Sequence, residues 1–191
     1  MPSTLLARRP AAASSRVGRA GPWVVAAVVV GAVLFALFTG GGVPDPVTRG
    51  SAAPHFELPA LGGGQVSLAD QRGKVVLLNF WATWCKPCEA EMPAMQNLYS
   101  ALAQEGFTLL AVSVDEEEAP VADFQRRLGL DFPLLLDPDQ RVSRLYQTYR
   151  FPESLLIDQR GRVVERYVGE KPWDSAVYVE RVRRLVAEGG A

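Results

Sequence analysis

Cys85 and Cys88 are the only thiols in the chain, and they are the residues best suited to carry chemistry. Two cysteines three positions apart can pass between dithiol and disulfide, whereas a bridge across so short a loop restrains the unfolded chain very little. We therefore expect the pair to serve redox exchange rather than stability. Zinc binding or a purely structural use of the thiols is the alternative that the spacing leaves open.

The flanking segments predict where this pair lies in the fold. Residues 75–80 are a near-continuous apolar run, which is typical of a buried parallel strand, and residues 89–99 have the composition of a helix. The motif should then lie at a helix N-terminus, where free N–H groups and the helix dipole favour a thiolate. Cys85 is predicted as the exposed attacking thiolate and Cys88, one turn further along, as the resolving thiol.

Two stretches around this motif resemble a known family. NFWATWCKPCEAEMP at 79–93 and FPESLLID at 151–158 are similar to membrane-anchored, thioredoxin-like thiol–disulfide oxidoreductases of the TlpA/ResA/CcmG type. The resemblance extends from about Ala53 to the C-terminus. It implies an α/β, thioredoxin-like fold with a central mixed β-sheet flanked by helices, an N-terminal β-hairpin and a central βα insertion.

The resemblance also implies a substrate-binding surface. Pro152 would form a cis peptide bond with Phe151 and face the cysteines, so that the backbone there pairs with the substrate; a trans proline at the start of a strand is the alternative. Trp84 would shield one side of the dithiol and offer flat apolar surface to a partner. Arg150 and Phe151 replace the commoner Gly-Val before this proline, which bears on partner specificity.

Glu91, three residues beyond Cys88, is the candidate for proton transfer. A carboxylate near the dithiol would oppose thiolate formation and could relay protons, and ResA-like members have an acid at the matching position. An ordinary acid favoured by the helix dipole is the alternative. Cytoplasmic thioredoxins place a buried aspartate where this chain has Asn79, which makes Glu91 the better candidate for that duty. We expect no cofactor and no metal.

Patterning predicts the remaining elements of the domain. A β-hairpin is expected at residues 55–61 and 65–68, strands at 107–114 and 132–136, helices at 119–128 and 140–148, an antiparallel hairpin at 154–158 and 162–168, and a closing helix at 173–187. The acidic run 115–118 at the end of one strand is interpreted as a solvated loop rather than a metal site.

The N-terminal region predicts attachment to a membrane. Residues 1–21 form an Arg-containing tail, 22–39 an apolar segment near the lower length limit for a membrane span, 40–54 a flexible tether and 55–191 the thioredoxin-like domain. Four arginines precede the apolar segment and all 21 acidic residues follow it. The positive-inside rule then places the tail in the cytoplasm and the domain outside. A cleaved signal peptide is the alternative.

Together these patterns predict a single-pass protein of the cell membrane whose extracytoplasmic, periplasmic-side domain exchanges thiols and disulfides. The resemblance implies reduction of exported proteins, with apocytochrome c or copper-site assembly proteins as substrates and a membrane thiol transporter as electron donor. A disulfide-donating oxidase and a Cu(I)-binding metallochaperone that uses the cysteine pair are the alternatives. A net charge of -1 with no basic cluster in the domain gives no support to nucleic-acid binding.

Overall fold

The computed structural model describes residues 21–39 and 46–189, in two units that divide after Val43. The first unit contains helix α1 (Pro22–Thr39), whose described side chains are apolar and exposed, among them Trp23 and Phe35. In the stretches that the structure describes, no helix reaches the length and apolarity needed to cross a membrane. Most of the predicted tail and the first part of the predicted tether lie outside the described residues.

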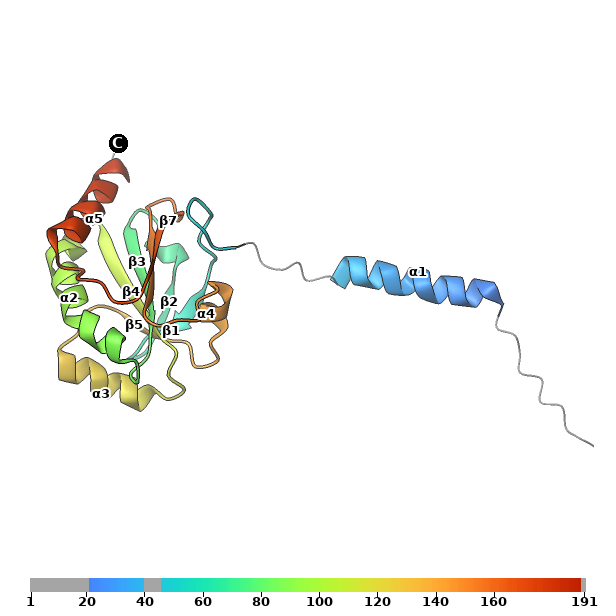
Figure 1. Ribbon diagram of the computed structural model, residues 1–191, viewed down its shortest axis with the longest axis horizontal. Coiled ribbons are helices and arrows are strands. Elements are labelled where there is room, and N and C mark those ends of the chain that lie inside the picture. The colour runs from blue at the N-terminus through green and yellow to red at the C-terminus, as the bar shows by residue number, and fades with distance from the viewer. Residues whose placement is uncertain (1–20, 40–45, 190–191) are drawn as a thin grey trace, which may run out of the picture. The chain divides into compact units, whose positions relative to one another are not determined.

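The second unit is built on a five-stranded sheet in the order β5-β4-β3-β6-β7 (Figure 1). The strands are β3 (Val75–Trp81), β4 (Phe107–Ser113), β5 (Leu134–Leu136), β6 (Glu153–Ile157) and β7 (Val163–Val168). The first three pair in parallel, while β6 and β7 are antiparallel to their neighbours. The predicted mixed sheet is thereby confirmed, and the apolar run before the cysteines forms its central strand.

Both faces of this sheet are covered, which is why all seven residues of β3 are buried. One face packs against α2 (Lys86–Leu102), α3 (Glu118–Leu128) and α5 (Ala176–Gly189). The other face packs against α4 (Arg141–Leu145) and the antiparallel hairpin of β1 (Glu57–Pro59) and β2 (Gln65–Ser67). Successive β3 side chains alternate between the two cores, so Trp81 joins the first and Phe80 the second. Short 3-10 helices occupy Ala69–Gln71 and Ala103–Glu105.

Two predicted helices differ from the structure at their ends. The helix expected at 140–148 is only α4, because Gln140 and Gln147 adopt left-handed φ values of 53° and 55° that an α-helix cannot continue. The closing helix starts at Ala176 instead of 173. Trp173 lies in the preceding loop, 2% exposed, with its ring against those of Tyr167 and Tyr178.

The segment before β1 is held against the sheet rather than forming a tether up to residue 54. Val47 and Ala53 are buried. Gly50 N donates to Val163 O at 2.7 Å, and Val163 N donates to Ser51 O at 2.9 Å. Because these backbone groups complete the edge of the sheet at β7, the expected tether does not include residues 47–54.

Candidate active site

The cysteine pair lies where the central strand passes into α2. Cys85 is the N-cap residue of that helix, with an extended backbone, and Pro87 stands in the first turn, where a missing N–H costs no helical hydrogen bond. Cys88 N donates to Cys85 Sγ at 3.3 Å. The Cys85 sulfur therefore faces the free N–H groups of a helix N-terminus, as predicted, and these groups favour its thiolate once the pair is reduced.

The two sulfurs are joined in a disulfide but differ in exposure. Cys85 is 6% exposed, whereas Cys88 is fully buried. Of the two residues, only Cys85 therefore has any surface exposed to an approaching partner. Cys85 is therefore much less exposed than predicted, because it joins the core on the α2 face of the sheet. The direction of the difference is the one expected if Cys85 attacks and Cys88 resolves.

Asp115 braces the turn that leads into the motif. It follows the end of β4, beside the end of β3, and its carboxylate accepts hydrogen bonds from Thr83 N at 2.9 Å and Thr83 Oγ1 at 2.7 Å. Ser113 Oγ donates to the same carboxylate at 2.6 Å. The interpretation of 115–118 as a solvated loop is therefore wrong for Asp115, which is 8% exposed, and correct for the exposed Glu116 and Glu117.

Glu91 is enclosed beneath the motif, one turn beyond Cys88 in α2. It is 3% exposed and accepts hydrogen bonds from Asn79 Nδ2 at 3.0 Å, Lys171 N at 3.1 Å and Trp173 Nε1 at 2.9 Å. Burial raises the pKa of Glu91 to about 7, although the three hydrogen bonds act in the opposite direction. A carboxyl group with this pKa can both give and take a proton near neutral pH.

A surface pocket of about 390 Å³ lies between α2 and the loop before α5. Glu91 and Ala94 from the helix and Lys171 and Asp174 from the loop before α5 are among its lining residues. Glu91 therefore borders this pocket, although the residue is only 3% exposed.

The side of the motif predicted to face the substrate carries exposed aromatic surface. Trp84 is 67% exposed, and its ring meets the ring of Phe151 edge to face, with centroids 6.1 Å apart. The Phe151–Pro152 peptide bond is cis, as the resemblance implied. Tyr149 and Arg150, on the same loop, are exposed. The structure thus brings the rings of Trp84 and Phe151 together next to Cys85, while Pro152, the next residue in the chain, is buried.

Comparison with known proteins agrees with this geometry. The model of the AhpC/TSA family matches residues 49–166. Thiol-disulfide oxidoreductase ResA of Bacillus thuringiensis (strain Al Hakam) is 39% identical over 149 residues, which cover 78% of this chain and 86% of that protein. ResA of Geobacillus kaustophilus is 45% identical over 123 residues, covering 64% of this chain and 71% of the relative.

A solved structure from Chlorobium tepidum, described as a candidate thiol:disulfide interchange protein DsbE, superposes with a TM-score of 0.66 at 32% identity. The superposed residues make up 76% of this chain and 99% of the Chlorobium tepidum chain. The chain belongs to the ResA-type thiol–disulfide oxidoreductases within the AhpC/TSA family.

In this oxidoreductase the acid nearest the helix start has a role different from that of Glu91. Glu89 forms ion pairs with Arg127 at 2.6 Å and Lys86 at 3.4 Å on the surface. The hydrogen bonds from Arg127 and then Lys86 lower the pKa of Glu89. Glu89 is therefore an ordinary acid in the first turn of the helix, where the helix dipole favours a negative charge. Its lowered pKa keeps it ionised at neutral pH.

Sequence reasoning missed two groups around the buried carboxyl of the oxidoreductase. Trp173 was assigned to the closing helix, and nothing local indicated that its N–H reaches Glu91. Ser154 Oγ accepts a hydrogen bond from Asn79 Nδ2 at 2.9 Å, and the available signal was a serine that precedes the apolar residues 155–157 of β6. Asn79 Oδ1 has no hydrogen-bond partner among the described residues.

Proposed function

We propose that this oxidoreductase reduces disulfides in exported proteins, with Cys85 as the attacking and Cys88 as the resolving residue. The observation that carries the proposal is the arrangement around α2: a slightly exposed Cys85 beside the aromatic rings of Trp84 and Phe151, a fully buried Cys88, and a carboxyl group with a raised pKa one turn further along. The platform of Trp84, Phe151 and Pro152 would receive the substrate chain.

The reaction proceeds in two exchanges. The Cys85 thiolate attacks one sulfur of the substrate disulfide, forming a mixed disulfide and releasing the other substrate sulfur as a thiolate that takes up a proton. The Cys88 thiol then loses its proton and attacks the Cys85 sulfur. This step forms the Cys85–Cys88 disulfide and releases the second substrate thiolate. Two electrons pass from the protein dithiol to the substrate.

Glu91 would accept the proton that Cys88 must lose. Its pKa of about 7 lies close to the working pH, which is where a general base is most effective. When ionised, it also opposes a second negative charge on the nearby dithiol. The first effect assists the attack by Cys88, whereas the second disfavours the thiolate form of the dithiol before a substrate is bound.

The substrate class and the donor come from the family resemblance. Apocytochrome c and copper-site assembly proteins are the proposed substrates, and a membrane thiol transporter is the proposed source of electrons. The names of the relatives state the exchange reaction alone. The exposed Arg150 on the substrate-facing loop supports a preference among partners, because it adds charge beside the platform.

The proposed location is the outer side of the cell membrane, with residues 22–39 as the anchor. Its support is the uncharged apolar sequence of this segment and the arginines before it. Extraction of membranes with alkaline carbonate tests it. An anchored chain stays in the membrane pellet, whereas release of the chain at its full length contradicts the anchor.

The experiment that tests direction is the reduction potential of the Cys85–Cys88 couple, equilibrated against dithiothreitol and followed by Trp fluorescence. A potential near or below about -270 mV supports a reductase, and one near about -120 mV indicates a disulfide donor. A Cu(I) titration of the reduced protein completes the test: tight Cu(I) binding without any disulfide reduction would make the chain a metal carrier.

A further inference from the structure

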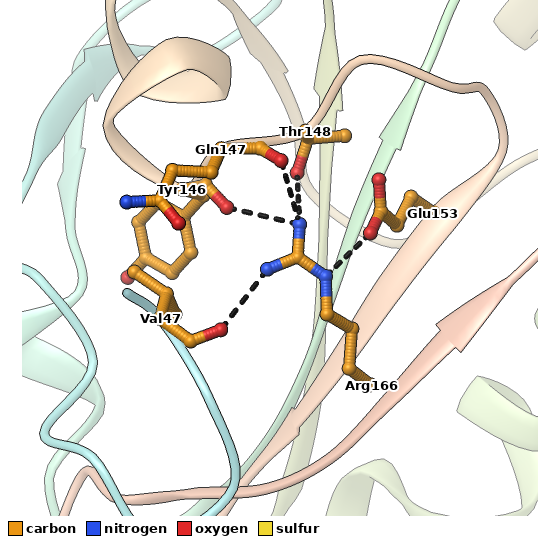
Figure 2. A network of polar contacts seen from close by, with 6 residues as sticks. All are labelled: Val47, Tyr146, Gln147, Thr148, Glu153 and Arg166. Carbon is orange, nitrogen blue, oxygen red and sulfur yellow. Dashed lines mark hydrogen bonds and ion pairs between the residues drawn. The ribbon is translucent and has the colours of Figure 1, made fainter. Parts of the chain in front are cut away.

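Arg166 in β7 makes a set of contacts unusual for a strand side chain (Figure 2). Its Nε forms an ion pair with Oε1 of Glu153. Its Nη1 donates to Val47 O at 3.1 Å. Its Nη2 donates to Tyr146 O at 3.0 Å, Gln147 O at 2.9 Å and, more weakly, Thr148 Oγ1 at 3.4 Å. One guanidinium group thus joins three separate segments of the chain.

Two of these segments border the substrate-facing loop at residues 149–152. The acceptors at 146–148 immediately precede the loop, and Glu153 immediately follows it. Arg166 therefore fixes both ends of the loop to one strand of the sheet. The loop between them carries Phe151, whose ring lies 6.1 Å from that of Trp84, beside Cys85.

The burial of the ion pair between Arg166 and Glu153 indicates that the pair serves to position the groups around it. The Glu153 side chain is 7% exposed and that of Arg166 is 23% exposed. Taking both charges out of water costs free energy that apolar residues of the same size would not incur. Stability therefore gives no reason for the pair, whereas the planar guanidinium, with donors in several fixed directions, is suited to hold backbone carbonyls and a carboxylate in one arrangement.

We propose that Arg166, with Glu153, is the positioning residue that holds the 149–152 loop in register with Cys85 and thereby determines how fast the enzyme acts on disulfides within a peptide chain. This rests on the proposed function of disulfide exchange at Cys85. The guanidinium touches neither sulfur and takes no part in the exchange. A small disulfide without peptide groups needs no register with the loop, so it reacts independently of Arg166.

The test compares two probe disulfides on the reduced full-length chain, followed by Trp fluorescence. One is a short synthetic peptide closed by a disulfide, and the other is cystamine, which has no peptide groups. In Arg166→Lys the charge remains but the fork of donors is lost. We expect the rate constant with the peptide to fall about tenfold, since misplacement of a positioning group by an ångström is costly, and that with cystamine to stay unchanged.

Glu153→Gln is the second variant, because it keeps the size and the acceptor while removing the ion pair. We again expect a lower rate constant with the peptide disulfide and an unchanged one with cystamine. If Arg166→Lys does not fold, Glu153→Gln provides the test. The matched control is Arg162→Lys, an exposed arginine just before β7 whose guanidinium bonds Gly50 O. Both of its rates should equal those of the wild type.

A fall of both rates together in the folded variants would show a merely structural role and overturn the proposal, as would a peptide rate that does not change. Failure of the unmodified enzyme with both probes would instead contradict the proposed disulfide exchange. The two failures are therefore distinguishable in one set of measurements.

Discussion

The indole Nε1 of Trp173 donates a hydrogen bond to Oε2 of Glu91 at 2.9 Å, across 82 positions of sequence. This bond ties the loop before α5 to the helix that carries the cysteines. It stabilises the ionised carboxylate, in opposition to the burial that destabilises it. The proton affinity of the group beneath the dithiol is thus set jointly by α2, β3 and the loop before α5.

Replacement of Glu91 by Gln should remove a pH dependence of stability in the oxidised protein. The pKa of Glu91 is raised from 4.5 to about 7, so the folded state keeps its proton longer than the unfolded chain. Stability is then fully present below pH 4.5 and falls as pH rises through 7. Relative to Glu91→Gln, the wild type should lose about 3 kcal/mol between these limits, at 1.36 kcal/mol per pKa unit. Urea unfolding across this range measures it.

The matched control for this change is Glu89→Gln. Because the pKa of Glu89 is lowered, its contribution to stability is lost as pH falls, not as it rises. This variant should therefore keep the wild-type decline towards alkaline pH. An equally steep decline in Glu91→Gln would mean that another group causes it.

Replacement of Trp173 by Phe should raise the pKa of Glu91 further. The ring is kept, but the donor to the carboxylate is lost, and a hydrogen bond to a charged group is worth about 1.5 to 3 kcal/mol, or roughly one to two pKa units. Carboxyl ¹³C shifts recorded against pH report the pKa directly. Tyr178→Phe, which keeps the ring packed against Trp173, is the control. A carboxyl pKa unchanged by Trp173→Phe would contradict the hydrogen bond.

Replacement of Asn79 by Asp should create a pair of carboxyl groups that share one proton. Asn79 Nδ2 donates to Glu91 Oε1 at 3.0 Å, and a second carboxylate at that distance disfavours double ionisation. Unfolding free energy should decline with pH more steeply than in the wild type. Asn79→Ala removes the donor without adding a charge, so a decline in Asn79→Asp no steeper than in Asn79→Ala would disprove the coupling.

The two single-cysteine variants should behave differently with partner proteins. Cys85 is the more exposed of the two, so Cys88→Ser should accumulate mixed disulfides with exported proteins, whereas Cys85→Ser should form almost none because Cys88 is fully buried. Non-reducing gels and mass spectrometry of the trapped species measure this. Trapping by Cys85→Ser alone would reverse the assigned roles.

Local sequence patterns were enough to predict the strand and the helix that flank the cysteines. The apolar run and the helical stretch after it placed Cys85 at a helix N-terminus, because strand and helix periodicity are properties of neighbouring residues. The helix expected at 140–148 failed for the opposite reason. Left-handed backbone at Gln140 and Gln147 depends on contacts with the rest of the domain, which composition does not report.

The sequence by itself determined the chemistry available to this protein: one reactive pair, the order of strand and helix around it, and an acid one turn beyond. The tertiary structure decided how that chemistry is tuned. Burial raises the pKa of Glu91, Asp115 turns inward to brace the strand end, and Arg166 joins both ends of the 149–152 loop. Each of these effects depends on desolvation or on contact between distant segments, and neither exists until the chain has folded.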